Sequence, residues 1–299
     1  MPNTPEPPPS RLIGLIGAGI GPSLSPALHE READEQGLRY LYRRLDLNEL
    51  GLAPDRVGDL LEAARLTGYT GLNITHPVKQ LVMAHLDGVA EEASVLGAVN
   101  TVLFKGGKAF GYNTDTSGFA RSVMTGLVGA PMDAVVVLGA GGAGAAVVHA
   151  LLAVGAGSVR VLDLDPVRTD RLVDALGGHF GRDRVSGGAA ADLEAALAEA
   201  DGLVHATPTG MREHPGTAVP PALLRPDLWV ADVVYRPLET ELLAAARARG
   251  CRTLDGGKMA VFQAVDSFRL FTGVEPDADR MLRHFDALTA GPKEAPAHA

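Results

Sequence analysis

Cysteine is almost absent from this 299-residue chain, whose single Cys251 excludes an intramolecular disulfide. No stretch rich in lysine or arginine stands out and the net charge is −9, so nucleic acid is not an expected partner. Glycines or charges interrupt every apolar run well short of 18 residues, which excludes a membrane span. The N-terminus lacks the basic and apolar regions of a secretory signal. Together these absences predict a soluble cytoplasmic protein.

Metal chemistry is not expected either, because no group of His, Cys and Asp residues has the spacing of a metal site. Hydrophobic residues make up 46% of the chain, which is ample for a core, and the length suits two domains. Residues 1–10, rich in proline, and 290–299 are predicted to be disordered tails. His76 and His205 are interpreted as surface, cleft or core residues rather than as ligands.

Residues 11–116 are predicted to form a compact α/β unit. Its expected strands are 11–16, 40–45, 71–74, 101–104 and 109–111, and its expected helices are 25–36, 57–66, 78–85 and 91–96. Ser25 before Pro26 has the pattern of an N-cap, and Gly37 is placed to end that helix. The glycines between Lys105 and Lys108 predict a hairpin turn.

Residues 117–257 alternate between strands and helices, which is typical of a parallel, doubly wound sheet of the dinucleotide-binding kind. The expected strands are 135–138, 159–162, near 184–185, 203–206, 229–233 and 252–254, and the expected helices are 167–176, 193–200 and 239–249. Two last helices, 258–271 and 277–288, have no strand after them. We expect them to pack back on the first domain across an interdomain cleft that holds the active site.

A glycine-rich turn follows the apolar strand Val135–Leu138. Gly139, Gly141 and Gly144 fit the G-x-G-x-x-G pattern, in which glycines allow a tight turn, the approach of a pyrophosphate, and close packing of helix and strand. Gly142 and Ala143 lie between them, at the expected N-terminus of a helix, where phosphates bind. A tight turn without a ligand is the alternative.

Asp163 ends the second strand of this unit, 24 residues after Gly139, near the position of a ribose-binding acid. A carboxylate there would repel the 2′-phosphate of NADP by roughly 4 kcal/mol at 4 Å and an effective dielectric near 20. The sequence therefore favours NAD over NADP. Arg168 lies a turn further on and would face the same ribose, or it is a solvated helix residue; Asp163 would otherwise be a strand-end cap.

Polar side chains gather where the strands of the first unit end. They are Ser23, Ser25, Asn73, Thr75, Lys79, Asn100, Thr101, Asn113, Thr114 and Asp115. A lysine beside a carboxylate, such as Lys79 with Asp115, can deliver a proton to a carbonyl oxygen while hydride arrives from a nicotinamide. The alternative for that pair is an unrelated helix lysine and turn aspartate, and for each Ser, Thr and Asn it is capping.

Seven motifs, in their order along residues 11–288, resemble the shikimate dehydrogenase family. They are Ser23-x-Ser25-Pro26, Asn73-Ile74-Thr75-x-Pro77-x-Lys79, Gly97-Ala98-Val99-Asn100-Thr101, Gly111-x-Asn113-Thr114-Asp115, Gly139–Gly144, Thr207-Pro208-Thr209-Gly210-Met211 and Asp232-Val233-Val234-Tyr235-x-Pro237. The resemblance implies reversible reduction of the ring ketone of 3-dehydroshikimate by a nicotinamide cofactor in the shikimate pathway.

The same resemblance implies residue roles. Lys79 and Asp115 would be the catalytic pair. Ser23 and Ser25 would bind the substrate carboxylate, and Thr75, Asn100 and Gln263 the ring hydroxyls, with Tyr235 also on the substrate side. The nicotinamide end would be lined by Thr207, Pro208, Gly210, Met211, Val233 and Gly256.

The chain departs from NADP-using members at one place. They carry Asn-Arg-Thr where this chain has Asp163-Leu164-Asp165, so the arginine that would clamp the 2′-phosphate is missing. The departure resembles the NAD-preferring quinate/shikimate dehydrogenase branch, which implies a catabolic role, although Ser25 stands where dual-substrate members tend to have threonine. An enzyme acting on an amino-substituted shikimate and a non-catalytic nucleotide-sensing module are alternatives. A monomer and a homodimer both fit the sequence.

Overall fold

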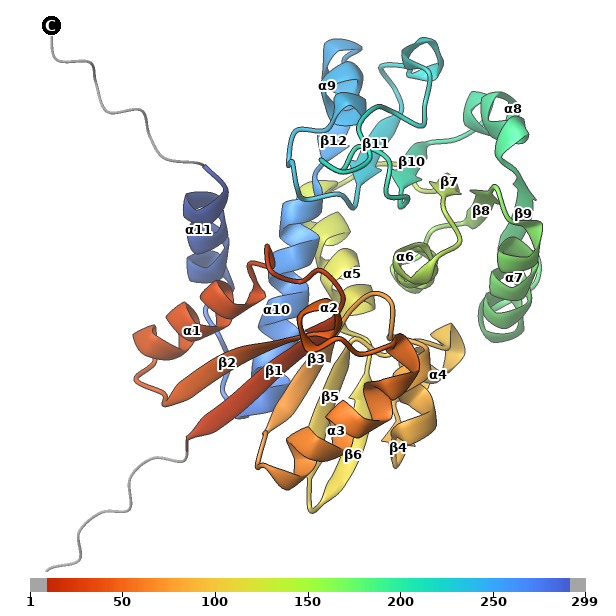
Figure 1. Cartoon of the computed structure of the whole chain (residues 1–299). Coiled ribbons are helices and arrows are strands. Elements are labelled where there is room, and N and C mark those ends of the chain that lie inside the picture. The colour runs from red at the N-terminus through yellow and green to blue at the C-terminus, as the bar shows by residue number, and fades with distance from the viewer. Residues whose placement is uncertain (1–9, 291–299) are drawn as a thin grey trace, which may run out of the picture.

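The computed structural model describes residues 10–290, which form two six-stranded sheets (Figure 1). The N-terminal sheet has the order β2-β1-β3-β5-β6-β4. Its strands are β1 (Arg11–Gly17), β2 (Tyr40–Asp46), β3 (Gly71–Ile74), β4 (Gly88–Val89), β5 (Thr101–Lys105) and β6 (Lys108–Tyr112). β1 pairs in parallel with β2 and β3, whereas β5 runs antiparallel to β3 and β6. The helices of this half are α1 (Ser25–Glu35), α2 (Leu47–Leu50), α3 (Val57–Leu66) and α4 (Glu91–Leu96).

The C-terminal sheet is parallel throughout, with the order β12-β11-β10-β7-β8-β9. Its strands are β7 (Ala134–Leu138), β8 (Ser158–Asp163), β9 (Val185–Ala189), β10 (Gly202–His205), β11 (Trp229–Asp232) and β12 (Arg252–Leu254). The helices between them are α6 (Gly142–Ala153), α7 (Pro166–Phe180), α8 (Leu193–Ala198) and α9 (Glu241–Ala248). Read from its other edge, this order is that of a dinucleotide-binding fold, which confirms the predicted fold class.

Buried apolar side chains cover both faces of the C-terminal sheet, as a parallel sheet requires. Val135 and Val137 point into one core cluster, and Val136 and Leu138 into the other. The alternation of β7 side chains between the two clusters explains why this strand reads as a continuous apolar run. The sheet is therefore a rigid support for the loops at its strand ends.

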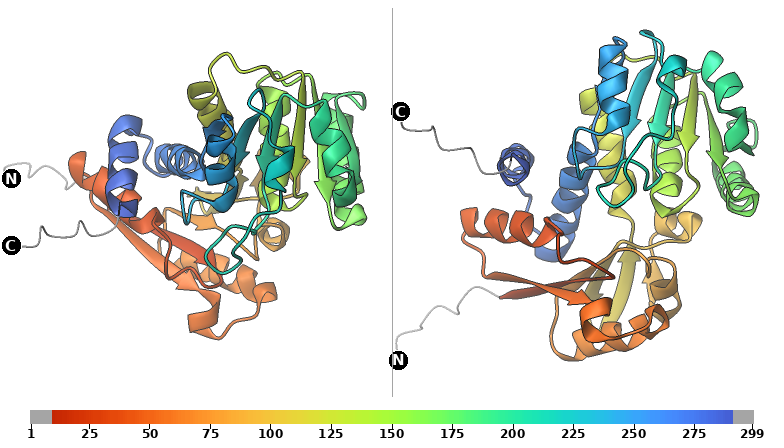
Figure 2. Two further views of the ribbon diagram at one scale, coloured as in Figure 1. Left: turned by 90° about the horizontal axis from the view of Figure 1, so that it is seen from above. Right: turned by 45° about the horizontal axis from the view of Figure 1, so that its top comes forward.

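Two long helices, α5 (Thr114–Gly126) and α10 (Gly256–Thr272), lie between the sheets (Figures 1 and 2). They approach so closely that a Cβ on Gly118 would lie 2.8 Å from the backbone nitrogen of Gln263. The last helix, α11 (Ala278–Thr289), contacts α1, where Arg280 binds the buried Glu32 at 2.6 and 2.8 Å. The C-terminal helices thus contact the N-terminal half of the chain.

Three local predictions need correction. The expected helix 78–85 is only a 3-10 turn, Leu81–His85, because the carbonyl of Lys79 accepts from the Val99 amide at 2.9 Å instead of from within a helix. Ser25 is the first residue of α1 and not its cap; the preceding Leu24 holds the cap position without a side-chain bond. The strand near 184–185 extends to Ala189, because the glycine-containing segment after Val185 pairs with β8. The predicted tails lie almost wholly outside the described residues.

Candidate active site

Lys79 and Asp115 form an ion pair, with Lys79 Nζ 2.6 Å from Asp115 Oδ2. Lys79 stands in the turn after β3, and Asp115 in the first turn of α5. The Asn113 side chain caps this helix by accepting from the Asp115 amide at 3.2 Å. Asp115 thus lies at a helix N-terminus, a favourable position for a carboxylate side chain. The side chains are 23% and 12% exposed, which leaves the pair partly desolvated and still reachable from solvent.

Asn100 organises the polar residues beneath this pair. Its side-chain oxygen accepts from the Thr114 amide at 2.8 Å and from the Thr101 hydroxyl at 3.0 Å, while its nitrogen donates to the Thr114 hydroxyl. Asn100 is only 3% exposed. Buried amides are held in one orientation when all their polar atoms have partners, so this network fixes Thr114, the first residue of α5, and with it Asp115.

The network continues toward Ser25 through residues that the sequence analysis did not connect. The Asn73 amide donates to the Thr101 hydroxyl at 3.2 Å and accepts from the Tyr42 hydroxyl at 2.7 Å. Burial raises the pKa of Tyr42 well above its usual value, against the effect of a hydrogen bond with Ser25. Tyr42 therefore stays a neutral donor and links the two ends of the predicted substrate site. Nothing in the sequence distinguishes it from an ordinary strand tyrosine.

Ser23 and Ser25 lie close together at the start of α1, where the Ser23 hydroxyl accepts from the Ser25 amide at 3.3 Å. The loop before them is held by Asp46, whose carboxylate accepts from the amides of Gly19 and Ile20 at 2.9 and 2.8 Å. These backbone bonds lower the pKa of Asp46 against the opposing effect of desolvation, which is the largest influence. Both serines are half-buried, at a helix N-terminus that favours anions.

Three other predicted substrate residues come from separate elements. Thr75 directly follows β3, and its amide donates to the Ile16 carbonyl of β1 at 2.9 Å. Tyr235 lies in the loop after β11; burial raises its pKa, with opposing effects from Arg236 and Asp115, so its phenol lies near the catalytic pair. Gln263 lies on α10, where it packs against Gly118 of α5.

The glycine turn is built as a dinucleotide site requires. Gly139 has φ +105°, and a Cβ on Gly144 would lie 1.9 Å from the Gly139 carbonyl oxygen, so both positions need glycine. A Cβ on Gly141 or Gly142 would meet nothing within 4 Å, so the turn is open on its outer side. Helix α6 starts here without a side-chain cap, and Ala143 lies in its first turn. Its N-terminal amides are available for the phosphates of a dinucleotide, and the turn fits that group.

Asp163 lies at the end of β8 and contacts the glycine turn directly. Its Oδ2 accepts from the Ala140 amide at 2.6 Å, and its Oδ1 from the Asp165 amide at 2.8 Å. Asp163 is therefore a cap that joins the two loops, in addition to any contact with a ribose. Arg168 is exposed on α7 and pairs with Asp165 at 3.2 Å, and Leu164 between these acids is 91% exposed.

The residues predicted for the nicotinamide end meet where β7, β10 and β11 terminate. A Cβ on Gly139 would lie 3.1 Å from the Thr207 side chain, and one on Gly256 would lie 2.4 Å from the Val233 carbonyl oxygen. The loop that begins at Thr207 continues through Pro208 and Gly210 to the exposed Met211. In this loop the Met211 amide donates to the Pro208 carbonyl, and Gly210 has φ +94°. The structure thus places these residues together at the carboxyl ends of these strands.

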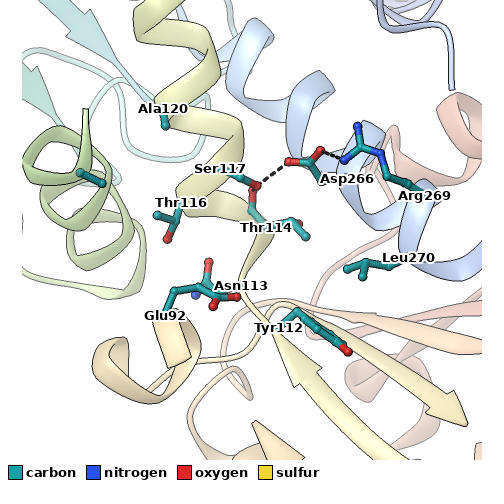
Figure 3. A pocket seen from close by; sticks show the side chains of 11 residues that line it. Glu92, Tyr112, Asn113, Thr114, Thr116, Ser117, Ala120, Asp266, Arg269 and Leu270 are labelled. Atoms are coloured by element: carbon teal, nitrogen blue, oxygen red, sulfur yellow. Dashed lines mark hydrogen bonds and ion pairs between the residues drawn. The ribbon is translucent and has the colours of Figure 1, made fainter. Parts of the chain in front are cut away.

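A hollow of about 440 Å³ opens beside α5 and α10 (Figure 3). Ser117 of α5 faces Asp266 of α10 there, and Asp266 pairs with Arg269 at 2.9 Å. The Thr116 hydroxyl in this wall is buried and has no hydrogen-bond partner. None of the residues predicted for substrate or cofactor lines this hollow.

Within residues 10–290, no group of three or more His, Cys, Asp or Glu side chains is suited to hold a metal ion. No helix in that range is long and apolar enough to cross a bilayer. Cys251 is buried, its thiol contacts the Arg225 carbonyl oxygen at 3.0 Å, and burial raises its pKa. Lys79 and Asp115 are close enough to exchange a proton, and the glycine turn suits a dinucleotide.

Comparisons with known proteins agree with this arrangement. Residues 15–102 match the family model described as the shikimate dehydrogenase substrate binding domain. Shikimate dehydrogenase (NADP(+)) of Streptomyces avermitilis is 63% identical over 273 residues, which are 91% of this chain and 94% of the relative. Quinate/shikimate dehydrogenase (NAD(+)) of Corynebacterium efficiens is 52% identical, over 93% of this chain and 99% of the relative. The solved structure of quinate dehydrogenase from Corynebacterium glutamicum in complex with NAD superimposes with a TM-score of 0.88 at 50% identity, and covers 93% and 99% of the two chains.

Proposed function

The chain belongs to the shikimate dehydrogenase family, and from that premise we propose that it oxidises shikimate reversibly to 3-dehydroshikimate with NAD as its preferred cofactor. Quinate is proposed as a second substrate, oxidised to 3-dehydroquinate. The observation that carries this proposal is the partly buried ion pair of Lys79 and Asp115, 2.6 Å apart. In this pair Lys79 Nζ can carry a proton, and the Asp115 carboxylate accepts a hydrogen bond from it.

In the proposed reaction, the bound dinucleotide supplies a hydride acceptor for the carbon that is oxidised. Lys79 and Asp115 remove the proton from the reacting hydroxyl as the carbonyl forms, and return it in the reverse direction. Asn100 keeps Asp115 in place through Thr114, as described above. The Lys79 ammonium group stabilises the charge that develops on the reacting oxygen.

The substrate contacts follow from the polar groups around the pair. We assign the substrate carboxylate to Ser23 and Ser25, since their hydroxyls stand at the N-terminus of α1. We assign the ring hydroxyls to Thr75, Asn100 and Gln263, and a further contact to Tyr235, whose buried phenol stays protonated. These neutral donors and acceptors suit a polyhydroxylated acid.

The preference for NAD is supported by Asp163 and by the lack of an arginine in Asp163-Leu164-Asp165. Relatives with NAD and with NADP in their names both match the chain closely, so this preference rests on the chain's own residues. The Asp163 carboxylate is held at the ribose end by two backbone amides, and it would repel a 2′-phosphate placed beside it.

We also propose the domain limits 11–116 and 117–257, with residues 258–289 packing on the first domain. Arg280 with Glu32, and the shared apolar cluster of Leu28 and Phe285, support the last assignment. The substrate domain then holds Lys79, and the helix that joins the domains holds Asp115. A monomer and a homodimer are both compatible with this proposal.

The decisive experiment is a rate matrix of shikimate, quinate and aminoshikimate against NAD and NADP. We expect the highest kcat/KM with shikimate and NAD, at least about tenfold above NADP, which is the charge estimate discounted for screening by solvent. Faster turnover of aminoshikimate would replace the substrate assignment. A lack of turnover with all three substrates would favour the nucleotide-sensing alternative.

The catalytic pair is tested by Lys79→Ala, with the exposed hairpin lysine Lys108→Ala as its matched control. Loss of the acid–base group should lower kcat about 100-fold or more. Binding of the dinucleotide, measured by calorimetry, should change less than twofold. If Lys79→Ala keeps the wild-type rate, the proposed mechanism is wrong.

A further inference from the structure

A histidine that the proposed reaction does not use links a buried aspartate to the nicotinamide end of the site. His205 is the last residue of β10, and Asp232 the last of the neighbouring β11. His205 Nδ1 lies 3.0 Å from Asp232 Oδ1, and His205 Nε2 lies 2.5 Å from the Thr207 hydroxyl. The side chains of His205 and Asp232 are 2% and 0% exposed, whereas Thr207 is half-buried at the strand end.

The direction of these hydrogen bonds follows from the Asp232 carboxylate. It also accepts from the Val234 amide at 3.0 Å and from the Thr240 hydroxyl at 2.7 Å, so it acts only as an acceptor. His205 Nδ1 must then carry the proton that faces Asp232. In the tautomer with its one proton on Nδ1, His205 has a lone pair on Nε2, and the Thr207 hydroxyl then donates its only proton to that lone pair.

Thr207 is left as an acceptor toward everything else. One lone pair of its oxygen receives the Thr209 amide at 3.3 Å, and a hydroxyl oxygen has two. The neighbouring backbone prevents the loop from shifting, because the Val233 amide donates to the His205 carbonyl and the Ala206 amide to the Leu138 carbonyl. The second lone pair is therefore held at a fixed place, while the Thr207 methyl group is the part of the side chain that lies toward Gly139.

We propose that His205 and Asp232 are positioning residues that make the Thr207 hydroxyl an acceptor for the amino group of the nicotinamide carboxamide. This inference rests on the proposed function, since it needs a pyridine dinucleotide in the glycine turn. The carboxamide has an N–H donor on one side and a carbonyl on the other. An obligatory acceptor at Thr207 selects the amino side and so sets the rotation of that group.

The experiment compares oxidised NAD with its 3-acetylpyridine analogue, which keeps the carbonyl but has a methyl group in place of the amino group. The variants are Thr207→Val, Thr207→Ser and His205→Asn. Asparagine can still donate to Asp232 but is too short to reach Thr207. The exposed His179→Asn, on α7 of the same half of the chain, is the matched control. Calorimetry gives Kd for both dinucleotides, steady-state kinetics gives KM and kcat, and thermal unfolding shows whether each variant folds.

Loss of one neutral hydrogen bond should raise the Kd and KM for NAD about fivefold in Thr207→Val and in His205→Asn, with kcat less affected. Thr207→Ser should remain within twofold of the wild type, and so should His179→Asn. Both disruptive variants should bind the analogue within twofold of the wild type. The double variant with both Thr207→Val and His205→Asn should bind NAD no more weakly than Thr207→Val alone, because His205 acts through Thr207.

An equal loss for NAD and the analogue would overturn the proposal, because the contact would not involve the amino group. The proposal would also be overturned if His205→Asn raised the Kd for NAD in the Thr207→Val variant as much as it does in the wild type. Dinucleotide binding decides these outcomes even for an enzyme without turnover. A failure of the proposed function would appear as a lack of product with every substrate, so the two failures are distinguishable.

Discussion

Replacing Asp163 by asparagine tests the proposed cofactor preference at the residue that carries it. The carboxylate joins two loops, since it accepts from Ala140 at 2.6 Å and from Asp165 at 2.8 Å. Asparagine has nearly the same shape, but its amide nitrogen would face one of these donors and cannot accept from it. The variant therefore changes the charge beside the ribose and also loosens the glycine turn.

The expected magnitudes follow from these contacts. Removing the negative charge relieves the repulsion of a 2′-phosphate, which is worth about 1.4 kcal/mol, or tenfold, after the discount for a half-exposed group. A weaker bond to the NAD ribose should add a further few-fold, so the NAD:NADP ratio of kcat/KM should fall by roughly ten- to fiftyfold. Loss of one charge-assisted bond to a backbone amide should cost about 2 kcal/mol, which lowers Tm by about 5 °C.

Asp201→Asn is the matched control. The Asp201 carboxylate also accepts from a backbone amide of β7, that of Ala134 at 2.9 Å, but at the opposite end of the strand. Its replacement should lower Tm without changing the NAD:NADP ratio. Steady-state kinetics with both cofactors and a thermal melt measure both effects. An unchanged ratio in Asp163→Asn, or equal use of NADP by the wild type, would refute the reasoning.

Two other predictions concern packing and pH. Gly256→Ala should lower Tm, at a cost of about 1–3 kcal/mol of stability, because the added Cβ would lie 2.4 Å from the Val233 carbonyl oxygen. Calorimetry should also show weaker dinucleotide binding. The control Gly178→Ala, whose Cβ would meet nothing within 4 Å, should change neither property. Burial lowers the pKa of His29 to about 3. Below pH 6.5 the unfolded chain therefore binds a proton that the folded chain does not, and the free energy of unfolding decreases as the pH is lowered. This effect should amount to about 2 kcal/mol at pH 5. Urea unfolding gives the decrease in the free energy of unfolding between pH 7 and pH 5, and this decrease should be smaller by that amount in His29→Asn than in the wild type. An equal decrease in the variant and the wild type would contradict the pKa shift.

The architecture could be predicted from the sequence because its signals are local. Several apolar runs of the second half, such as 135–138 and 252–254, end in glycine or a charged residue, and helical patterns separate the runs. This alternation is typical of a parallel sheet, which buries both faces of its strands. The requirement for glycine is also local at Gly144, whose Cβ would meet the Gly139 carbonyl oxygen, and at Gly139 through its φ of +105°. The errors occurred where distant residues take part, as at Lys79, whose carbonyl is used by Val99.

The sequence by itself thus determined the fold class, the family and the residue types of the site. Only the tertiary structure decided which of those residues meet: Lys79 and Asp115 are 36 residues apart, and His205 and Asp232 are 27 apart. It also showed that Asp163 holds the glycine turn, and that Tyr42 connects Ser25 to Asn73. The physical reason is that a side chain's partner depends on where separate strands end, which pairing and packing across the whole sheet determine.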